Sequence, residues 1–250
     1  MVVISIANQK GGEGKTTTSL NLAHGLSMQN KSVLLIDVDP QANSSGIFLD
    51  VNKLSNSITE LFLQKKKISE LIHKTKYTNL DILPSNIGLA EVELSALNIE
   101  VPYVLRDAVV EISDKYDFII IDCPPSLSIF TVNALVSSHY VIIPLQAEKF
   151  SIDGIKGLQN TIESIKRRIN PDLKILGALI TQLKSNTILT KTILPVIQNY
   201  FPVFKTSIST GVSIGESHLS QKTIIDYNPG GKQAMEYLTF VKEVIDGVKV

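Results

Sequence analysis

Residues 10–18 of this 250-residue chain read Lys-Gly-Gly-Glu-Gly-Lys-Thr-Thr-Thr and have the types and spacing of a phosphate-binding loop. They lie between an apolar run, Val2 to Ala7, and a run with helical apolar spacing that begins at Leu20. The order strand, glycine-rich turn, helix directs several backbone amides at one anion. Lys15 would bring its charge to the terminal phosphates, and the Thr16 hydroxyl would bind a magnesium ion held by them. The predicted nucleotide-binding residues are Lys10, Gly11, Gly12, Glu13, Gly14, Lys15, Thr16 and Thr17.

Two acidic segments follow predicted strands and could act on a nucleotide. Residues 37–41 read Asp-Val-Asp-Pro-Gln, and successive strand residues point to opposite faces, so Asp37 and Asp39 should not share one role. Asp39 is the better candidate to orient or deprotonate a water molecule, although an Asp-Pro pair is equally typical of a turn. Asp122 ends the apolar run 118–121, where a Walker B aspartate would support magnesium through its water or through the Thr16 hydroxyl.

The elements that must position these residues form an alternating α/β pattern. The near-continuous apolar runs are typical of parallel strands buried on both faces. Strands are predicted at 2–7, 32–37, 80–83, 118–122, 140–144, 174–183 and 204–208, and helices at 88–98, 103–115, 152–169, 187–200 and 233–248, with one after the glycine loop and two short ones within 50–79. Pro195 predicts a kink or break in the helix that contains it. We therefore expect one P-loop domain spanning 1–250, with a mostly parallel twisted sheet of about seven strands and helices on both faces.

Composition limits the function classes. Apolar residues make up 44% and charged residues 19% of the chain, and no run is long enough to span a bilayer, so we expect a cytoplasmic globular protein. The one cysteine, Cys123, cannot form an internal disulfide. The net charge is zero, but residues 154–210 carry eight Lys or Arg and two acids, a net of +6. This asymmetry is as typical of solvated helix faces as of a surface for an acidic partner.

Taken together, the motifs resemble those of the ParA/MinD family of deviant Walker A ATPases. They are segments 10–18, 37–41, 121–126 (Ile-Asp-Cys-Pro-Pro-Ser) and 141–146 (Val-Ile-Ile-Pro-Leu-Gln), and segments 82–86 and 224–229 also fit. The resemblance runs from Met1 to about residue 245. It is strongest to the short, Soj-like ParA proteins of chromosome and plasmid partition.

This resemblance implies the roles of individual residues. Lys10 would be the signature lysine that reaches the nucleotide of a second subunit, while Lys15 and Thr16 hold phosphates and Mg²⁺. Asp39 would position the attacking water, and Asp122 would support the metal. Proteins of this family hydrolyse ATP weakly alone. They form a homodimer with ATP, bind DNA non-specifically as that dimer and associate with the nucleoid, and are stimulated by a ParB-like centromere-binding partner.

Two departures from the family pattern affect the prediction. Position 13 is usually valine, and a carboxylate is unfavourable beside phosphates, so we hypothesise that Glu13 projects toward the dimer interface and pairs with a cation such as Lys10. The alternative is a neutral substitution that faces outward. The arginines that Soj-like relatives use for DNA are absent, since segment 211–213 reads Gly-Val-Ser. Other cations must replace them, and the predicted DNA-binding residues are Lys184, Lys174, Arg167, Arg168 and Lys191.

Other functions are compatible with the same loop. A MinD-like membrane ATPase would need a basic amphipathic tail, and the last predicted helix mixes lysines with acids. A metabolic P-loop enzyme would need a second small substrate. An iron-sulfur carrier of the nitrogenase-reductase type needs more cysteines than this chain has.

Overall fold

The computed structural model describes residues 1–95, 101–146, 152–184 and 188–248. Within them the chain forms one eight-stranded sheet in which only the edge strand is antiparallel. The strands lie in the order β3 (His73–Lys74), β4 (Leu80–Leu83), β2 (Val33–Asp37), β5 (Phe118–Asp122), β1 (Val2–Ile6), β6 (Tyr140–Gln146), β7 (Lys174–Leu183) and β8 (Val203–Ser209). The predicted fold class and all seven predicted strands are confirmed.

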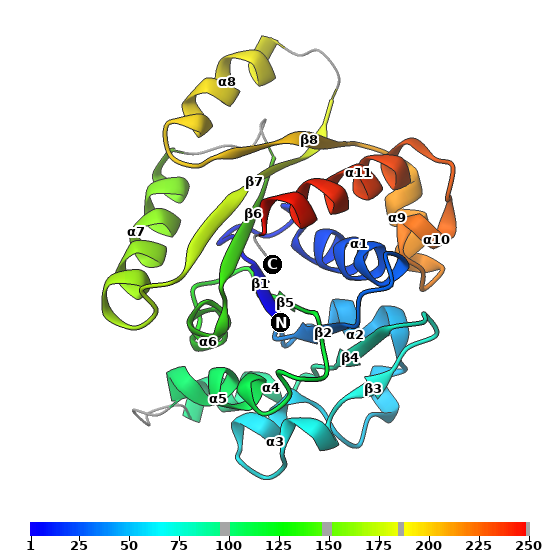
Figure 1. The fold of residues 1–250 in the computed structure, drawn as a ribbon, viewed down its shortest axis with the longest axis vertical. Coiled ribbons are helices and arrows are strands. Elements are labelled where there is room, and N and C mark those ends of the chain that lie inside the picture. Colours follow the sequence, from blue (N-terminus) through cyan, green and yellow to red (C-terminus); the bar gives the residue numbers. More distant parts are fainter. Residues whose placement is uncertain (96–100, 147–151, 185–187, 249–250) are drawn as a thin grey trace.

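The helices cover both faces of this sheet (Figure 1). They are α1 (Lys15–Met28), α2 (Asn43–Phe48), α3 (Ile58–Phe62), α4 (Leu89–Ser95), α5 (Val104–Val110), α6 (Ile129–Ser137), α7 (Ile152–Arg168), α8 (Ile188–Gln198), α9 (Val212–Leu219), α10 (Ile224–Tyr227) and α11 (Lys232–Gly247). Short 3₁₀ turns lie at Val51–Lys53, Ile68–Glu70 and Val101–Tyr103. The sequence pattern did not indicate α2, α6, α9 or α10, and α8 is not divided at Pro195.

Two apolar clusters fill the space between sheet and helices. Strand residues alternate between them: Val3 belongs to the cluster that includes residues of α3 to α8, and Ile4 to the cluster that includes residues of α1, α10 and α11. Because both faces are covered, the central strands β1, β2 and β5 are apolar except for Ser5 and the aspartates that end β2 and β5. Figure 1 shows α6 and α7 on one side of the sheet and α1 and α11 on the other.

The expectation for residues 50–79 was incomplete. Besides α3 and the short turns, this region forms β3, which pairs antiparallel with β4 in the register His73↔Ile82 and Lys74↔Asp81. The Lys74 ammonium lies 2.9 Å from the Asp81 carboxylate across this pair. A two-residue strand is too short to show the alternation from which strands are predicted.

Candidate functional site

The strand order places the glycine loop beside an acidic strand end. β1 leads directly into the loop, and its neighbour β5 pairs in the register Ile6↔Asp122. β5 also pairs with β2 in the register Asp37↔Asp122. The loop, Asp122 and the segment after β2 therefore meet at the carboxyl edge of the sheet, where open α/β sheets bind ligands.

The glycine loop has the backbone of an anion cradle. Gly12 (φ 78°) and Gly14 (φ 85°) adopt left-handed conformations that side chains disfavour. Gly14 precedes α1, and no side chain caps this helix end. The first amides of α1 are thus left to a ligand or solvent.

Lys15 lies inside this cradle. Its side chain is buried, and its ammonium donates a hydrogen bond to the Lys10 carbonyl oxygen at 2.8 Å. Burial lowers the pKa of Lys15, and the nearby Asp122 opposes this shift most strongly. Lys10 itself is exposed on the rim of the loop. The structure thus separates a buried lysine from an exposed one five residues earlier.

Asp122 is fully buried and held by hydroxyl groups. Ser19 Oγ donates to one carboxylate oxygen at 2.9 Å, and Ser44 Oγ donates to the other at 2.5 Å. Burial raises the pKa of Asp122, while hydrogen bonds from Ser44, Ser19 and Thr16 oppose this shift. The carboxylate therefore lies near the Thr16 side chain, as a metal-supporting aspartate would.

Asp37 and Asp39 have separate environments, as their positions predict. Asp37 is fully buried and accepts hydrogen bonds from the Ser45 amide (2.9 Å), the Ser45 hydroxyl (2.7 Å) and the Asp39 amide (3.0 Å). Burial, followed by the charge of Asp122, raises the pKa of Asp37 to about 8. Asp39 follows the strand, and its carboxylate accepts from the Gln41 amide at 2.9 Å. Asp37 thus fixes the turn that presents Asp39.

Sequence reasoning missed the serines of this network. Ser19 follows the loop threonines on α1, and Ser44 and Ser45 lie in the first turn of α2, separated from segment 37–41 by two residues. A Ser-Ser pair at the start of a helix after an acidic strand end is the only signal that could have indicated them. Through these hydroxyls α1 and α2 are both attached to the buried carboxylates.

The hypothesis that Glu13 projects toward an interface is wrong in this structure. Its side chain is only 2% exposed, and Oε2 accepts a hydrogen bond from the Gln146 amide at 2.5 Å. Thr181 Oγ1 donates to the Glu13 carbonyl oxygen at 2.9 Å, and the Gln146 side chain donates to the Gly12 carbonyl oxygen. The carboxylate points into the protein because the Gln146 amide at the end of β6 is a buried donor for it. Glu13 therefore attaches the loop to β6 and β7.

A pocket of about 140 Å³ adjoins the loop on the side of β7 and β8. Its lining includes Gly14 and Thr17 from the loop and α1, and Gly211, Ile214 and Gly215 around the start of α9. Apolar and polar groups share the lining, as in small-molecule sites generally. The pocket is therefore placed to receive the part of a ligand that extends away from the phosphates.

The predicted DNA-binding residues do not form one patch. Lys174 begins β7 and Lys184 follows its end, so about 30 Å of strand separates them. Arg167 and Arg168 end α7 and lie toward the start of β7, and all four of these cations are exposed. Lys191 lies in α8, on the Lys184 side, and its side chain is outside the described residues. The predicted set is therefore divided between the amino-terminal and the carboxyl-terminal ends of the strands.

Other site classes find no support in the described ranges. They contain no cluster of three or more His, Cys, Asp or Glu that could hold a metal ion by itself. No helix among them is long and apolar enough to cross a membrane. Cys123 is a buried free thiol, and burial raises its pKa, which is typical of an unreactive core cysteine.

Comparison with known proteins identifies the family. The model of the family described as "AAA domain" matches residues 1–175. The sporulation initiation inhibitor protein Soj of Bacillus subtilis is 38% identical over 246 residues, which cover 97% of each chain. The chain belongs to the ParA/MinD family. It is therefore a ParA-type ATPase.

Two solved structures extend this comparison of the ParA-type chain. Cobyrinic acid a,c-diamide synthase from Mycobacterium smegmatis, solved with bound ADP and magnesium, is 32% identical with a TM-score of 0.86, covering 98% of this chain and 94% of that one. A putative plasmid partition protein from Borrelia burgdorferi, bound to AMPPNP, is 29% identical with a TM-score of 0.84, covering 99% of each. The relatives of this ParA-type chain thus include partition proteins and a protein named as a biosynthetic enzyme.

Proposed function

We propose that this ATPase dimerises with ATP, binds DNA non-specifically in that state, and hydrolyses ATP with a ParB-like partner to segregate a chromosome or plasmid. The observation that carries the proposal is the pair of lysines in one loop. Lys15 is buried within the phosphate cradle, whereas Lys10 is exposed on its rim. A second subunit facing this rim would receive the Lys10 charge at its own nucleotide, so ATP would favour the dimer.

ATP and Mg²⁺ fit the residues of the site. The open amides of the loop and the Lys15 ammonium would hold the phosphates. Bound Mg²⁺ would neutralise charge on the phosphate oxygens, and the Thr16 hydroxyl, next to Asp122, would be its protein ligand. The base would occupy the pocket between Thr17 and the start of α9.

The chemistry left to the protein is to orient a water molecule. Asp39 is held at the end of β2 by the hydrogen bond from its amide to Asp37. Its carboxylate would accept a proton from the attacking water or align it toward the terminal phosphate. The Lys10 charge from the second subunit would stabilise the charge that develops there. Hydrolysis would then remove the terminal phosphate, which both subunits contact, and the dimer would dissociate.

DNA retardation by the purified protein with ATP, ADP or no nucleotide, over a salt series, tests this function. Binding only with ATP and a steep loss with salt are expected, because phosphate neutralisation dominates such binding. Lys10→Ala should abolish the ATP-dependent gain, whereas Lys115→Ala, which changes a lysine exposed outside the site, should not. Binding that is equal in all three nucleotide states would refute the proposal.

The divided cation set makes a second comparison informative. The carboxyl-edge variant, Lys184→Ala with Lys191→Ala, changes cations on the loop side of the sheet. The amino-edge variant changes Arg167, Arg168 and Lys174 to Ala. We expect the carboxyl-edge variant to bind DNA more weakly at every sequence and to lower the salt slope by about one per lost phosphate contact. If only the amino-edge variant binds DNA more weakly, the DNA-binding surface lies at the amino-terminal ends of the strands.

The name of the M. smegmatis relative keeps a metabolic enzyme as the second candidate. Such an enzyme would turn over ATP only with a second small substrate. An ATPase rate that rises with DNA and a ParB-like protein, but not with small carboxylic acids and an amide donor, would favour partition. The opposite pattern would favour synthesis.

A further inference from the structure

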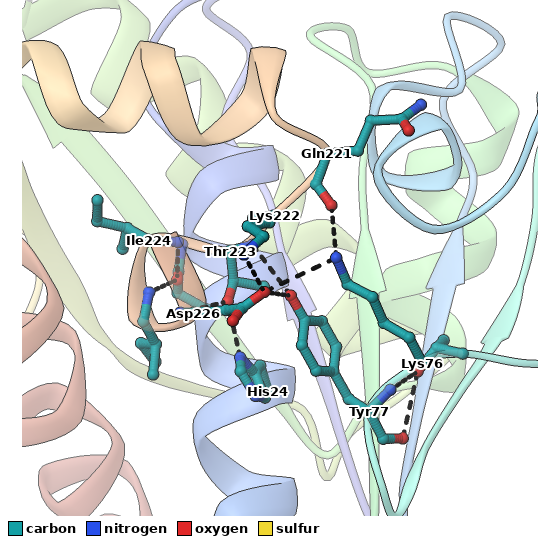
Figure 2. Close-up of polar contacts among 11 residues, drawn as sticks. His24, Lys76, Tyr77, Gln221, Lys222, Thr223, Ile224 and Asp226 are labelled. Carbon is teal, nitrogen blue, oxygen red and sulfur yellow. Dashed lines mark hydrogen bonds and ion pairs between the residues drawn. The ribbon is translucent and has the colours of Figure 1, made fainter. Parts of the chain in front are cut away.

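Successive turns of α1 hold the segment that contains α9 and α10 through polar contacts. The Thr17 hydroxyl lies 3.4 Å from the His218 ring nitrogen on α9. One turn later, Asn21 accepts a hydrogen bond from the Ile224 amide at 3.0 Å and donates to the Thr17 carbonyl oxygen at 2.8 Å. In the next turn, His24 Nδ1 forms a 2.7 Å hydrogen bond with the Thr223 hydroxyl (Figure 2). One face of α1 therefore joins the glycine loop to α10.

The loop between β3 and β4 also contacts α10, through Lys76 and Tyr77. Figure 2 shows the Tyr77 ring against His24, and the two rings stack at 3.9 Å between centroids. The Tyr77 hydroxyl donates to the Asp226 carboxylate at 2.9 Å. The Lys76 ammonium lies 3.7 Å from the same carboxylate and donates to the Gln221 carbonyl oxygen at 2.9 Å. His24, Tyr77, Thr223 and Asp226, with Lys76, are called the α10 clamp below.

α10 depends on these contacts for its position. It has four residues, too few to be stable as an isolated helix. Thr223 caps it by accepting a hydrogen bond from the Asp226 amide at 3.2 Å, and the same threonine binds His24. The residues of the clamp are thus used both to form α10 and to attach it to α1.

The chain connects the clamp to residues of α9 that line the pocket beside the loop. Residues 220–223 connect α9 to α10, and Ile214 and Gly215 of α9 line that pocket together with Thr17. None of the five clamp residues is among those that line the pocket. Any influence of the clamp on a ligand there must therefore pass through the placement of α9.

We propose that the α10 clamp positions the base-side wall of the nucleotide site, with Tyr77 and Thr223 acting as positioning residues through α9 and α10. The inference rests on the proposed placement of the base in the pocket beside Thr17. The phosphate cradle is built from the loop and the first turn of α1, and β6 and β7 hold the loop through Glu13. The clamp contacts α1 two turns further on, at His24, so loosening it should change contacts to the base and leave contacts to the phosphates intact.

Calorimetric affinities for MgATP and for magnesium tripolyphosphate, which carries no base, test this inference. Tyr77→Phe removes the hydroxyl that binds Asp226 and keeps the stacked ring. Thr223→Val keeps the side-chain shape and removes the α10 cap, so it gives an independent perturbation. Both variants should bind MgATP about three- to ten-fold more weakly, because the binding-competent wall is less populated, and should bind tripolyphosphate as the wild type does.

Tyr116→Phe is the matched control. Tyr116 also donates to a carboxylate, Asp81, at 2.8 Å, but it contacts β4 and not α10. This variant should leave both affinities unchanged. Thermal unfolding confirms that every variant is folded before titration.

The outcomes separate the inference from the proposed function. Equal weakening for both ligands would show that the clamp supports the phosphate cradle, and unchanged MgATP affinity would show that it is structural only; either result overturns the inference. If the wild type binds MgATP no better than tripolyphosphate, the base wall contributes nothing and the inference is wrong, although an ATP site remains. Failure of the wild type to bind either ligand would instead contradict the proposed function.

Discussion

His24 should make the stability of this protein depend on pH. Burial, partly offset by the charge of Asp226, lowers the pKa of His24 to about 4, whereas an unfolded chain has a histidine pKa of about 6.5. Between these values the unfolded state binds the proton and the folded state does not. The free energy of unfolding is therefore retained in full above about pH 6.5 and falls as the pH decreases toward 4. The linkage relation gives a loss of about 2 kcal/mol between pH 7 and pH 5 from this one group.

The perturbation is His24→Gln, which removes the titrating ring and keeps a polar side chain beside Thr223. Urea unfolding of the wild type and the variant at pH 7 and pH 5 measures the change with pH for each protein. The wild type should lose about 2 kcal/mol more than the variant over this interval, whatever the difference between them at pH 7. Equal losses in the two proteins would refute the reasoning, because His24 would then have the same pKa in both states.

Two further predictions concern the loop and the acidic strand end. Asp39→Asn should bind MgATP like the wild type but release phosphate about 100-fold more slowly or worse, since it cannot align or deprotonate water; titration and phosphate release measure the two effects, and an unchanged rate would remove Asp39 from the mechanism. Glu13→Val leaves the buried Gln146 amide without its acceptor and should lower the free energy of unfolding by about 1–3 kcal/mol, whereas Glu13→Gln keeps an acceptor and should lose less. Equal unfolding midpoints for these two variants would contradict the role assigned to Glu13.

The phosphate cradle and the metal-supporting aspartate were predictable because their signals are local. Lys15 and Thr16 follow the glycines within one turn of α1, and this spacing holds wherever the helix packs. Asp122 ends a strand of four consecutive apolar residues, which identifies the strand without knowledge of its neighbours. β3 was not predictable, because its two residues are held only by pairing with β4.

Contacts between distant segments could not be read in the same way. The order of residues does not reveal that β5 lies between β1 and β2, and only this order brings Asp37 beside Asp122. Glu13 appeared free to project outward, because its acceptor role depends on an amide 133 residues away. The predicted DNA-binding cations were close in sequence, yet a strand as long as β7 carries its two ends to opposite edges of the sheet.

By itself the sequence determined the family, the α/β class and the residues that would face phosphates, since each follows from residue types within a few positions of one another. The tertiary structure alone decided which strands are neighbours, where Glu13 points, how the serines hold the buried carboxylates, and that α1, α10 and the Tyr77 loop meet. These features depend on pairing and packing between segments far apart in the chain, which periodicity and spacing do not encode.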